Sequence, residues 1–255
     1  MTNPPPTLIE SWLPFETIGA ESLRDASAAR KPPLNRLHVW WARRPLTVSR
    51  AAVLAGLLPQ WSEDWPAPLR QKFPTEEAYH AWFTRLLGIL GDPVAARKIV
   101  EYEKSAGIRT PGNKYGYPRA FTHTPSQEEL GTLWELLELM WGTRELAVMD
   151  PMAGGGSIPF EALRYGFTVL ASELNPVASV ILKATLDYPA RFGIGLADDI
   201  KKWGKRWYEL IRPRLEPYFA PPPGEPKRSI YMWARTVACP VTGKLVQRGV
   251  NLLAV

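Results

Sequence analysis

The sequence is nearly devoid of cysteine. Cys239 is the single cysteine among 255 residues, so a disulfide within the chain is impossible and a zinc ribbon, which needs several thiolates, is excluded. The N-terminus reads MTNPPPTLIESW and lacks the basic start and apolar run of a secretory signal. No apolar run approaches the length that spans a bilayer. We therefore expect a cytoplasmic protein with no membrane segment and no metal site.

Acidic residues are in modest deficit, and the basic residues are concentrated in two segments. The chain has 31 Lys and Arg against 25 Asp and Glu, a formal net charge of +6. Residues 24–50 hold seven basic side chains and one acid, and residues 201–255 hold eleven and three. This excess suits a polyanionic partner, but it also suits an ordinary solvated surface. The composition alone therefore leaves nucleic-acid binding open.

Two short apolar runs are typical of parallel strands. Residues 146–150 (LAVMD) and 167–173 (FTVLASE) flank a helical pattern over 158–166, and Asn175-Pro176 begins another helix. This strand–helix–strand–helix order predicts a parallel pair in an α/β protein. Ligands of such sheets bind beyond the carboxyl ends of the strands.

The first strand runs into an acidic, glycine-rich turn. The sequence DPMAGGGS places Asp150 at the strand end and Gly154 to Gly156 directly before the next helix. The dinucleotide pattern G-x-G-x-x-G fails, since Pro159 stands where its third glycine belongs, and no Gly-Lys-Ser/Thr follows. An acid at this turn disfavours a phosphate and favours a cationic or hydroxyl-bearing ligand.

The second strand ends in another acid, Glu173. In an open α/β sheet, an acid at this position accepts hydrogen bonds from the ribose hydroxyls of an adenosine-like ligand. Leu174 beside it is suited to pack on the adenine. Two acids, bare backbone and no phosphate motif together favour S-adenosylmethionine (SAM), whose sulfonium and ammonium groups are cationic.

Several stretches resemble a known family. DPMAGGGS is similar to the first motif of amino-methylating DNA methyltransferases. Together with RLHVWWARRPL, SELNPVASVILKATLDYPARFG and YMWARTVACPVTGK, it resembles the N-terminal part of adenine-specific DNA methylases that begin with a domain of unknown function. Such methylases are often found in bacterial and archaeal phage-defence and restriction-modification loci. The likeness covers most of residues 8–246.

The resemblance implies a SAM site and a nucleic-acid surface. The cofactor-binding positions that it implies, with the two acids above, are Asp150, Pro151, Ala153, Gly154, Gly156, Glu173, Leu174 and Asn175. The stretch His38–Pro45 resembles a cofactor-side motif that some amino-methyltransferases place just before the glycine turn, although here about 100 residues intervene. Trp41, Arg43, Arg44, Lys202 and Arg206 are the candidates for contact with DNA. A core aromatic pair with a solvated basic rim is the alternative for Trp41 and its neighbours.

The catalytic tetrad of such enzymes is missing. Asp/Asn-Pro-Pro-Tyr/Phe positions the exocyclic amine of a flipped adenine, and no stretch of this sequence matches it. We therefore expect no catalytic residue here, and a chain that resembles an N-terminal portion needing a partner chain or a C-terminal half. A non-catalytic DNA-binding or assembly subunit, and an RNA methyltransferase, remain as alternatives.

The expected architecture is an α/β, Rossmann-like SAM-dependent methyltransferase fold with an incomplete parallel sheet. Four regions are predicted: an N-terminal family-specific region (1–59), a helical insertion (60–124), the SAM-binding core (125–218), and a proline-rich connector with a truncated C-terminal segment (219–255).

Overall fold

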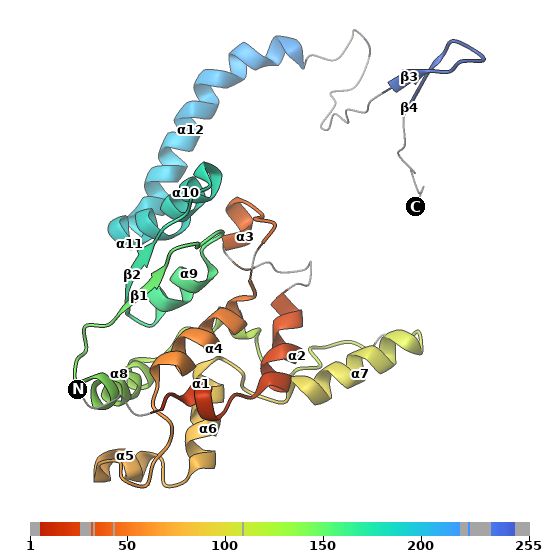
Figure 1. Ribbon diagram of the computed structural model, residues 1–255. Coiled ribbons are helices and arrows are strands. Elements are labelled where there is room, and N and C mark those ends of the chain that lie inside the picture. Colours follow the sequence, from red (N-terminus) through yellow and green to blue (C-terminus); the bar gives the residue numbers. More distant parts are fainter. Residues whose placement is uncertain are drawn as a thin grey trace. The chain divides into compact units, whose positions relative to one another are not determined.

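Helices are the commonest regular elements of the described residues in the computed structural model (Figure 1). The structure describes residues 6–25, 32, 34–42, 44–108, 110–219, 224 and 236–247. The chain forms two units, residues 1–193 and 194–255. The elements of the first unit are α1 (Leu8–Ser11), α2 (Phe15–Asp25), α3 (Leu34–Leu37), α4 (Leu46–Leu57), α5 (Ala67–Lys72), α6 (Glu76–Leu86), α7 (Pro93–Ser105), η1 (Ala120–Thr122), α8 (Gln127–Trp141), β1 (Ala147–Asp150), α9 (Ser157–Arg164), β2 (Thr168–Ala171), α10 (Pro176–Leu182), η2 (Lys183–Asp187) and α11 (Tyr188–Phe192).

The helices begin and end at local sequence signals. Thr75 and Asp92 accept hydrogen bonds from the first turns of α6 and α7. Ser126 and Glu129 form a reciprocal capping box at the start of α8, and Gly142 ends that helix at φ +68°. Each of these caps follows from a few neighbouring residues.

One apolar core joins the helical part of the first unit to the strands. It contains residues from α1, α4, α6, α8 and α9 together with Phe167, which directly precedes β2. A smaller cluster brings Leu46 of α4 against Ala153 of the glycine turn and Leu182 of α10. The strands are therefore held by the helices that precede them in the chain.

The two strands form a small parallel sheet, as the sequence predicts. Ala147 pairs with Thr168, and Asp150 pairs with Ala171. Helix α9 contacts both strands on one side and α4 on the other (Figure 1). β2 covers Thr168–Ala171 and is shorter than the predicted strand over 167–173. The architecture is therefore mixed α/β and rich in helix.

The other face of this sheet is exposed. Met149 and Leu170 are register partners, and they are 66% and 55% exposed. Val148 and Val169 alternate with them and pack against the core. A two-stranded sheet is marginally stable by itself, so its stability here depends on the packing of α9.

The second unit contains α12 (Gly195–Leu215), η3 (Glu216–Tyr218) and the antiparallel pair β3 (Thr236–Ala238) and β4 (Leu245–Gln247). α12 is amphipathic, but none of its residues is buried. Its apolar stripe, Ile200, Trp203, Trp207 and Leu210, is between 54% and 64% exposed. Because such a stripe normally faces a core, the helix presents an apolar surface without a partner among the described residues of its unit.

Candidate functional site at the carboxyl edge of the sheet

The turn after β1 folds back onto the end of β2. Asp150 accepts a hydrogen bond at its backbone oxygen from Ser172 N (2.9 Å), and Ser172 O accepts one from Ala153 N (3.0 Å). These two bonds continue the pairing of the strands beyond the ladder. They fix the glycine turn beside the residues that follow β2, among them Glu173.

Glu173 bridges the glycine turn and the start of α10. Its Oε2 accepts a hydrogen bond from Gly154 N (2.7 Å), and its Oε1 accepts one from Asn175 N (3.1 Å). The bonds from Asn175 and Gly154 lower the pKa of this carboxyl below its usual value, so it stays ionised at neutral pH. An ionised carboxylate offers about four acceptor positions, so these backbone bonds do not use all of them.

The glycines are required by packing as well as by the turn. Gly154 and Gly156 have φ values of +53° and +83°, which side-chain-bearing residues rarely adopt. A Cβ atom on Gly154 would lie 3.1 Å from Nε1 of Trp40, and one on Gly155 would lie 3.1 Å from Cβ of the same tryptophan. At Gly156 the nearest atom would be Cδ2 of Leu182, at 2.9 Å. Part of the bare backbone is therefore covered by Trp40.

The segment around Trp40 meets the glycine turn although it lies far away in the sequence. Trp40 is buried, and Trp41 stacks on it with 4.4 Å between ring centroids. Ser157 Oγ at the start of α9 donates a hydrogen bond to the backbone oxygen of Arg44 (3.1 Å). Trp41 itself is 79% exposed. The aromatic pair therefore divides into a core residue and a surface residue, and Arg43 lies outside the described residues.

The remaining predicted cofactor positions surround this edge. Asp150 is half-buried, and its Oδ1 accepts a hydrogen bond from Met152 N (3.1 Å). Pro151 is exposed, and Ala153 is buried. Leu174 is 99% exposed, so its side chain is free to contact a ligand.

Asn175 acts first as a helix cap. Its Oδ1 accepts a hydrogen bond from Val177 N (2.9 Å) at the start of α10, as its Asn-Pro context predicts. It thereby fixes the chain that follows Glu173 and Leu174. Lys202 and Arg206 belong to α12 in the second unit, where both are exposed.

A cavity of about 570 Å³ lies beside Glu173. Its size falls within the range of small-molecule sites. It is lined by Leu163, Val169, Ala171, Ser172, Glu173, Ser179, Leu182, Lys183, Leu186, Asp187, Ala190 and Arg191. Asp150 and Gly154 do not line it, so Glu173 is the predicted cofactor residue that the cavity and the glycine turn share.

A buried ion pair holds the helix that follows the glycine turn. Arg50 Nε of α4 donates to Glu161 Oε2 of α9 over 2.7 Å, and both side chains are fully buried. Arg50 Nη1 also donates to the backbone oxygens of Leu87 (2.6 Å) and Ala120 (2.9 Å). One guanidinium therefore connects α4, α9, the end of α6 and the start of η1.

Sequence reasoning missed Trp40 and Arg50 as positioning residues. Both act on partners more than 100 residues away, and no local pattern marks such a contact. The one available signal was the resemblance of the segment from His38 to Pro45 to a cofactor-side motif. The contact of Trp40 with Gly154 and Gly155 places this segment at the glycine turn, and its role beside a cofactor stays a prediction.

Two negative observations apply to the described part of the chain. None of its helices combines the length and the apolar character needed to cross a membrane. It also contains no group of three or more His, Cys, Asp or Glu side chains arranged to hold a metal ion.

Residues 12–85 match the model of a family described as "Protein of unknown function (DUF1156)". The match is consistent with a domain of unknown function in the N-terminal part, and it includes both Trp40 and Arg50. No curated protein matches the chain, and no solved structure does. The matched segment is thus packed directly on the glycine turn and on α9, whereas the methylase family stays a prediction.

Proposed function

We propose that this chain is the SAM-binding part of an adenine-N6 DNA methyltransferase with a Rossmann-like core. The observation that carries the proposal is the pair of hydrogen bonds that Glu173 accepts at the glycine turn and at α10. They hold an ionised carboxylate at the carboxyl edge of two parallel strands, where ligands of such sheets bind.

The residues at this edge suit SAM chemically. The acceptor capacity left on Glu173 suits a ribose hydroxyl. The exposed side chain of Leu174 offers an apolar contact for an adenine. Asp150 supplies a second negative charge for a cationic ligand. When bound, SAM would supply the methyl group, and these residues would orient it and neutralise its charge.

The adenine itself must be bound by other residues. The tetrad that would position its amine is absent from these 255 residues, so methyl transfer requires that group from another segment or chain. The exposed Met149 and Leu170 offer a surface on which further strands or helices of such a core would pack.

A titration of SAM into the full chain by calorimetry tests the proposal. We expect binding that weakens in Glu173→Gln and in Asp150→Asn. Glu145→Gln is the matched control, because Glu145 is an exposed acid beside the opposite end of β1. Absence of binding at millimolar SAM, or equal affinity in all four proteins, would contradict the proposal.

A DNA-binding or assembly subunit without cofactor is the second candidate. The exposed basic residues of α12 favour it, including Lys202 and Arg206. Such a subunit would bind duplex DNA with an affinity that falls steeply with salt, and it would show no heat with SAM. Measuring both ligands on one preparation separates the two functions.

A further inference from the structure

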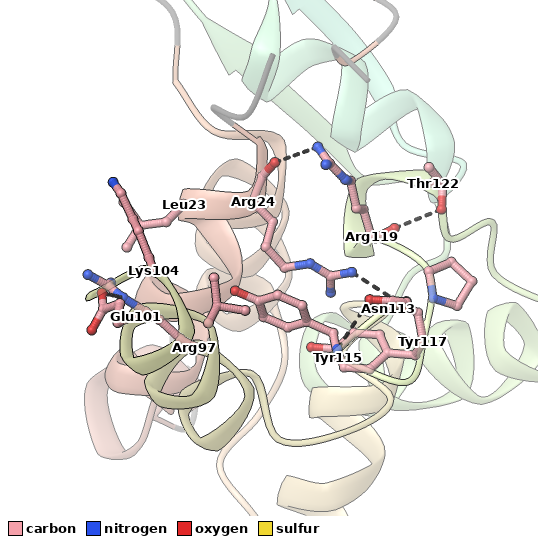
Figure 2. Close-up of a pocket in the computed structure, with 12 residues that line it drawn as sticks. Leu23, Arg24, Arg97, Glu101, Lys104, Asn113, Tyr115, Tyr117, Arg119 and Thr122 are labelled. Carbon is pink, nitrogen blue, oxygen red and sulfur yellow. Dashed lines mark hydrogen bonds and ion pairs between the residues drawn. The ribbon is translucent and has the colours of Figure 1, made fainter. Parts of the chain in front are cut away.

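A second cavity lies among the helices of the first unit. It has a volume of about 720 Å³ and is formed by α2, α7 and the segment 113–122. It shares no lining residue with the cavity beside Glu173. Figure 2 shows Arg24 at its centre, with Lys104 and Glu101 on one side and Arg119 and Thr122 on the other. Its chemistry can therefore be considered independently of the carboxyl edge.

Positive charge predominates in this cavity. Four cationic side chains line it, Arg24, Arg97, Lys104 and Arg119, against one carboxylate, Glu101. That carboxylate is already paired, since Arg97 Nε donates to Glu101 Oε1 over 2.6 Å. Lys104 forms no ion pair with any described residue. Arg24 is in turn paired with Glu21, outside the lining, so the site that the cavity offers an anion is at Lys104.

Arg24 is held rigidly in place. Its Nη1 donates to both carboxylate oxygens of Glu21 (3.0 and 2.8 Å), and its Nη2 donates to the backbone oxygen of Tyr117 (3.1 Å). Its guanidinium carbon lies 3.9 Å from the centroid of the Tyr115 ring. The Arg24 side chain is only 8% exposed. Cation and aromatic ring together form a fixed floor, so a ligand would meet a preorganised surface.

The rest of the lining is largely apolar. Leu23, Val100 and Pro118 contribute to the walls together with the ring of Tyr115. The cavity is far larger than a phosphate ion, and its size is that of sites for small organic ligands. A ligand that uses the whole lining therefore combines an anionic group with a larger body that has apolar faces. A nucleoside carrying a phosphate has both features.

We propose that this cavity binds a nucleoside phosphate, with the phosphate at Lys104 and the nucleoside against Tyr115, Leu23 and Val100. The same chemistry is available from a free mononucleotide and from one residue of a nucleic-acid strand. The site is separate from the proposed SAM site, and it does not depend on that function.

Calorimetric titrations of the full chain with adenosine 5′-monophosphate, adenosine, inorganic phosphate and a single-stranded DNA dodecamer test the proposal. Binding of the mononucleotide is expected, with a dissociation constant about fivefold higher in Lys104→Ala, because one charge contact is lost. Lys98→Ala is the matched control, since Lys98 is exposed on the same helix but does not line the cavity. Saturating SAM should not displace the mononucleotide.

The outcomes separate the two sources of ligand. Binding of the mononucleotide with this sensitivity to Lys104 supports a free nucleotide, and the same sensitivity with the dodecamer alone supports a strand. Four results would overturn the proposal: no binding by either ligand, equal affinity in Lys104→Ala and Lys98→Ala, phosphate or adenosine binding as tightly as the mononucleotide, or displacement by SAM.

Discussion

Removing the charge of Glu161 should destabilise the first unit strongly. Glu161 and Arg50 are fully buried and 2.7 Å apart, and Arg164 Nη1 lies 3.2 Å from the same carboxylate. In Glu161→Gln the shape of the side chain is retained, but two guanidinium groups lose their counter-charge. Breaking a buried ion pair from one side costs about 3–5 kcal/mol. For a chain of this size, that corresponds to a fall of roughly 6–20 °C in the midpoint of thermal unfolding.

Urea unfolding of the full chain, followed by tryptophan fluorescence, measures this loss. Glu101→Gln is the matched control, because its partner Arg97 is also an arginine but both side chains are well exposed. We expect the control to lose about 0.2–1 kcal/mol. A loss of under about 1 kcal/mol in Glu161→Gln would refute the reasoning. It would mean that α4 and α9 do not enclose this pair, and the scaffold of the glycine turn would then be wrong.

Three further predictions follow from the same packing. Gly156→Ala should lower the free energy of unfolding more than Gly142→Ala does. Positive φ costs both variants about 1–2 kcal/mol, but only Gly156→Ala places a Cβ 2.9 Å from Leu182. Denaturant unfolding compares the two variants, and equal losses would contradict this prediction. Trp40→Ala should lose about 3–5 kcal/mol in the same assay and also weaken SAM binding, whereas Trp41→Ala, at an exposed position, should stay near the wild-type stability. Burial raises the pKa of Asp25 to about 6, so its protonated form is favoured in the folded state. Relative to Asp25→Asn, the free energy of unfolding of the wild type should be greatest below pH 4 and fall by about 3 kcal/mol as pH rises through 6. Parallel pH profiles of the two proteins would contradict this.

The local part of the fold follows directly from the sequence. A cap such as Asp92 before Pro93, or Ser126 with Glu129, acts on amides within three residues of itself. The strand ending at Asp150 and the acid after the second strand were also predictable, because short apolar runs mark both strands. Short-range signals therefore give the helices, the parallel pair and the two acids at its edge.

The long-range packing does not follow from such signals. The sequence indicates three glycines at the turn, but it does not reveal that Trp40 covers two of them. It likewise gives no sign that Arg50 lies beside Glu161, 111 positions away. Both contacts join segments more than 100 positions apart, so they form only when the chain packs as a whole.

The cavity around Arg24 illustrates the same limit. Its basic residues are spread over α2, α7 and the segment 113–122. From the sequence alone, each of them is expected to be an ordinary solvated charge. The fold brings them together because Glu21 fixes Arg24 and also accepts hydrogen bonds from Tyr117 Oη (2.7 Å) and Ala120 N (2.8 Å). A buried acid was the organising feature, and no motif marked it.

The most direct measurement compares S-adenosylhomocysteine with its 2′-deoxyribose form, each titrated into the full chain and into Glu173→Gln. If Glu173 accepts a ribose hydroxyl, removing the hydroxyl should weaken binding to the wild type by about tenfold, the usual order for a hydrogen bond to a charged group. The same removal should change little in Glu173→Gln. Equal affinity of both ligands for the wild type, or no binding of either, would contradict a cofactor site at this edge of the sheet.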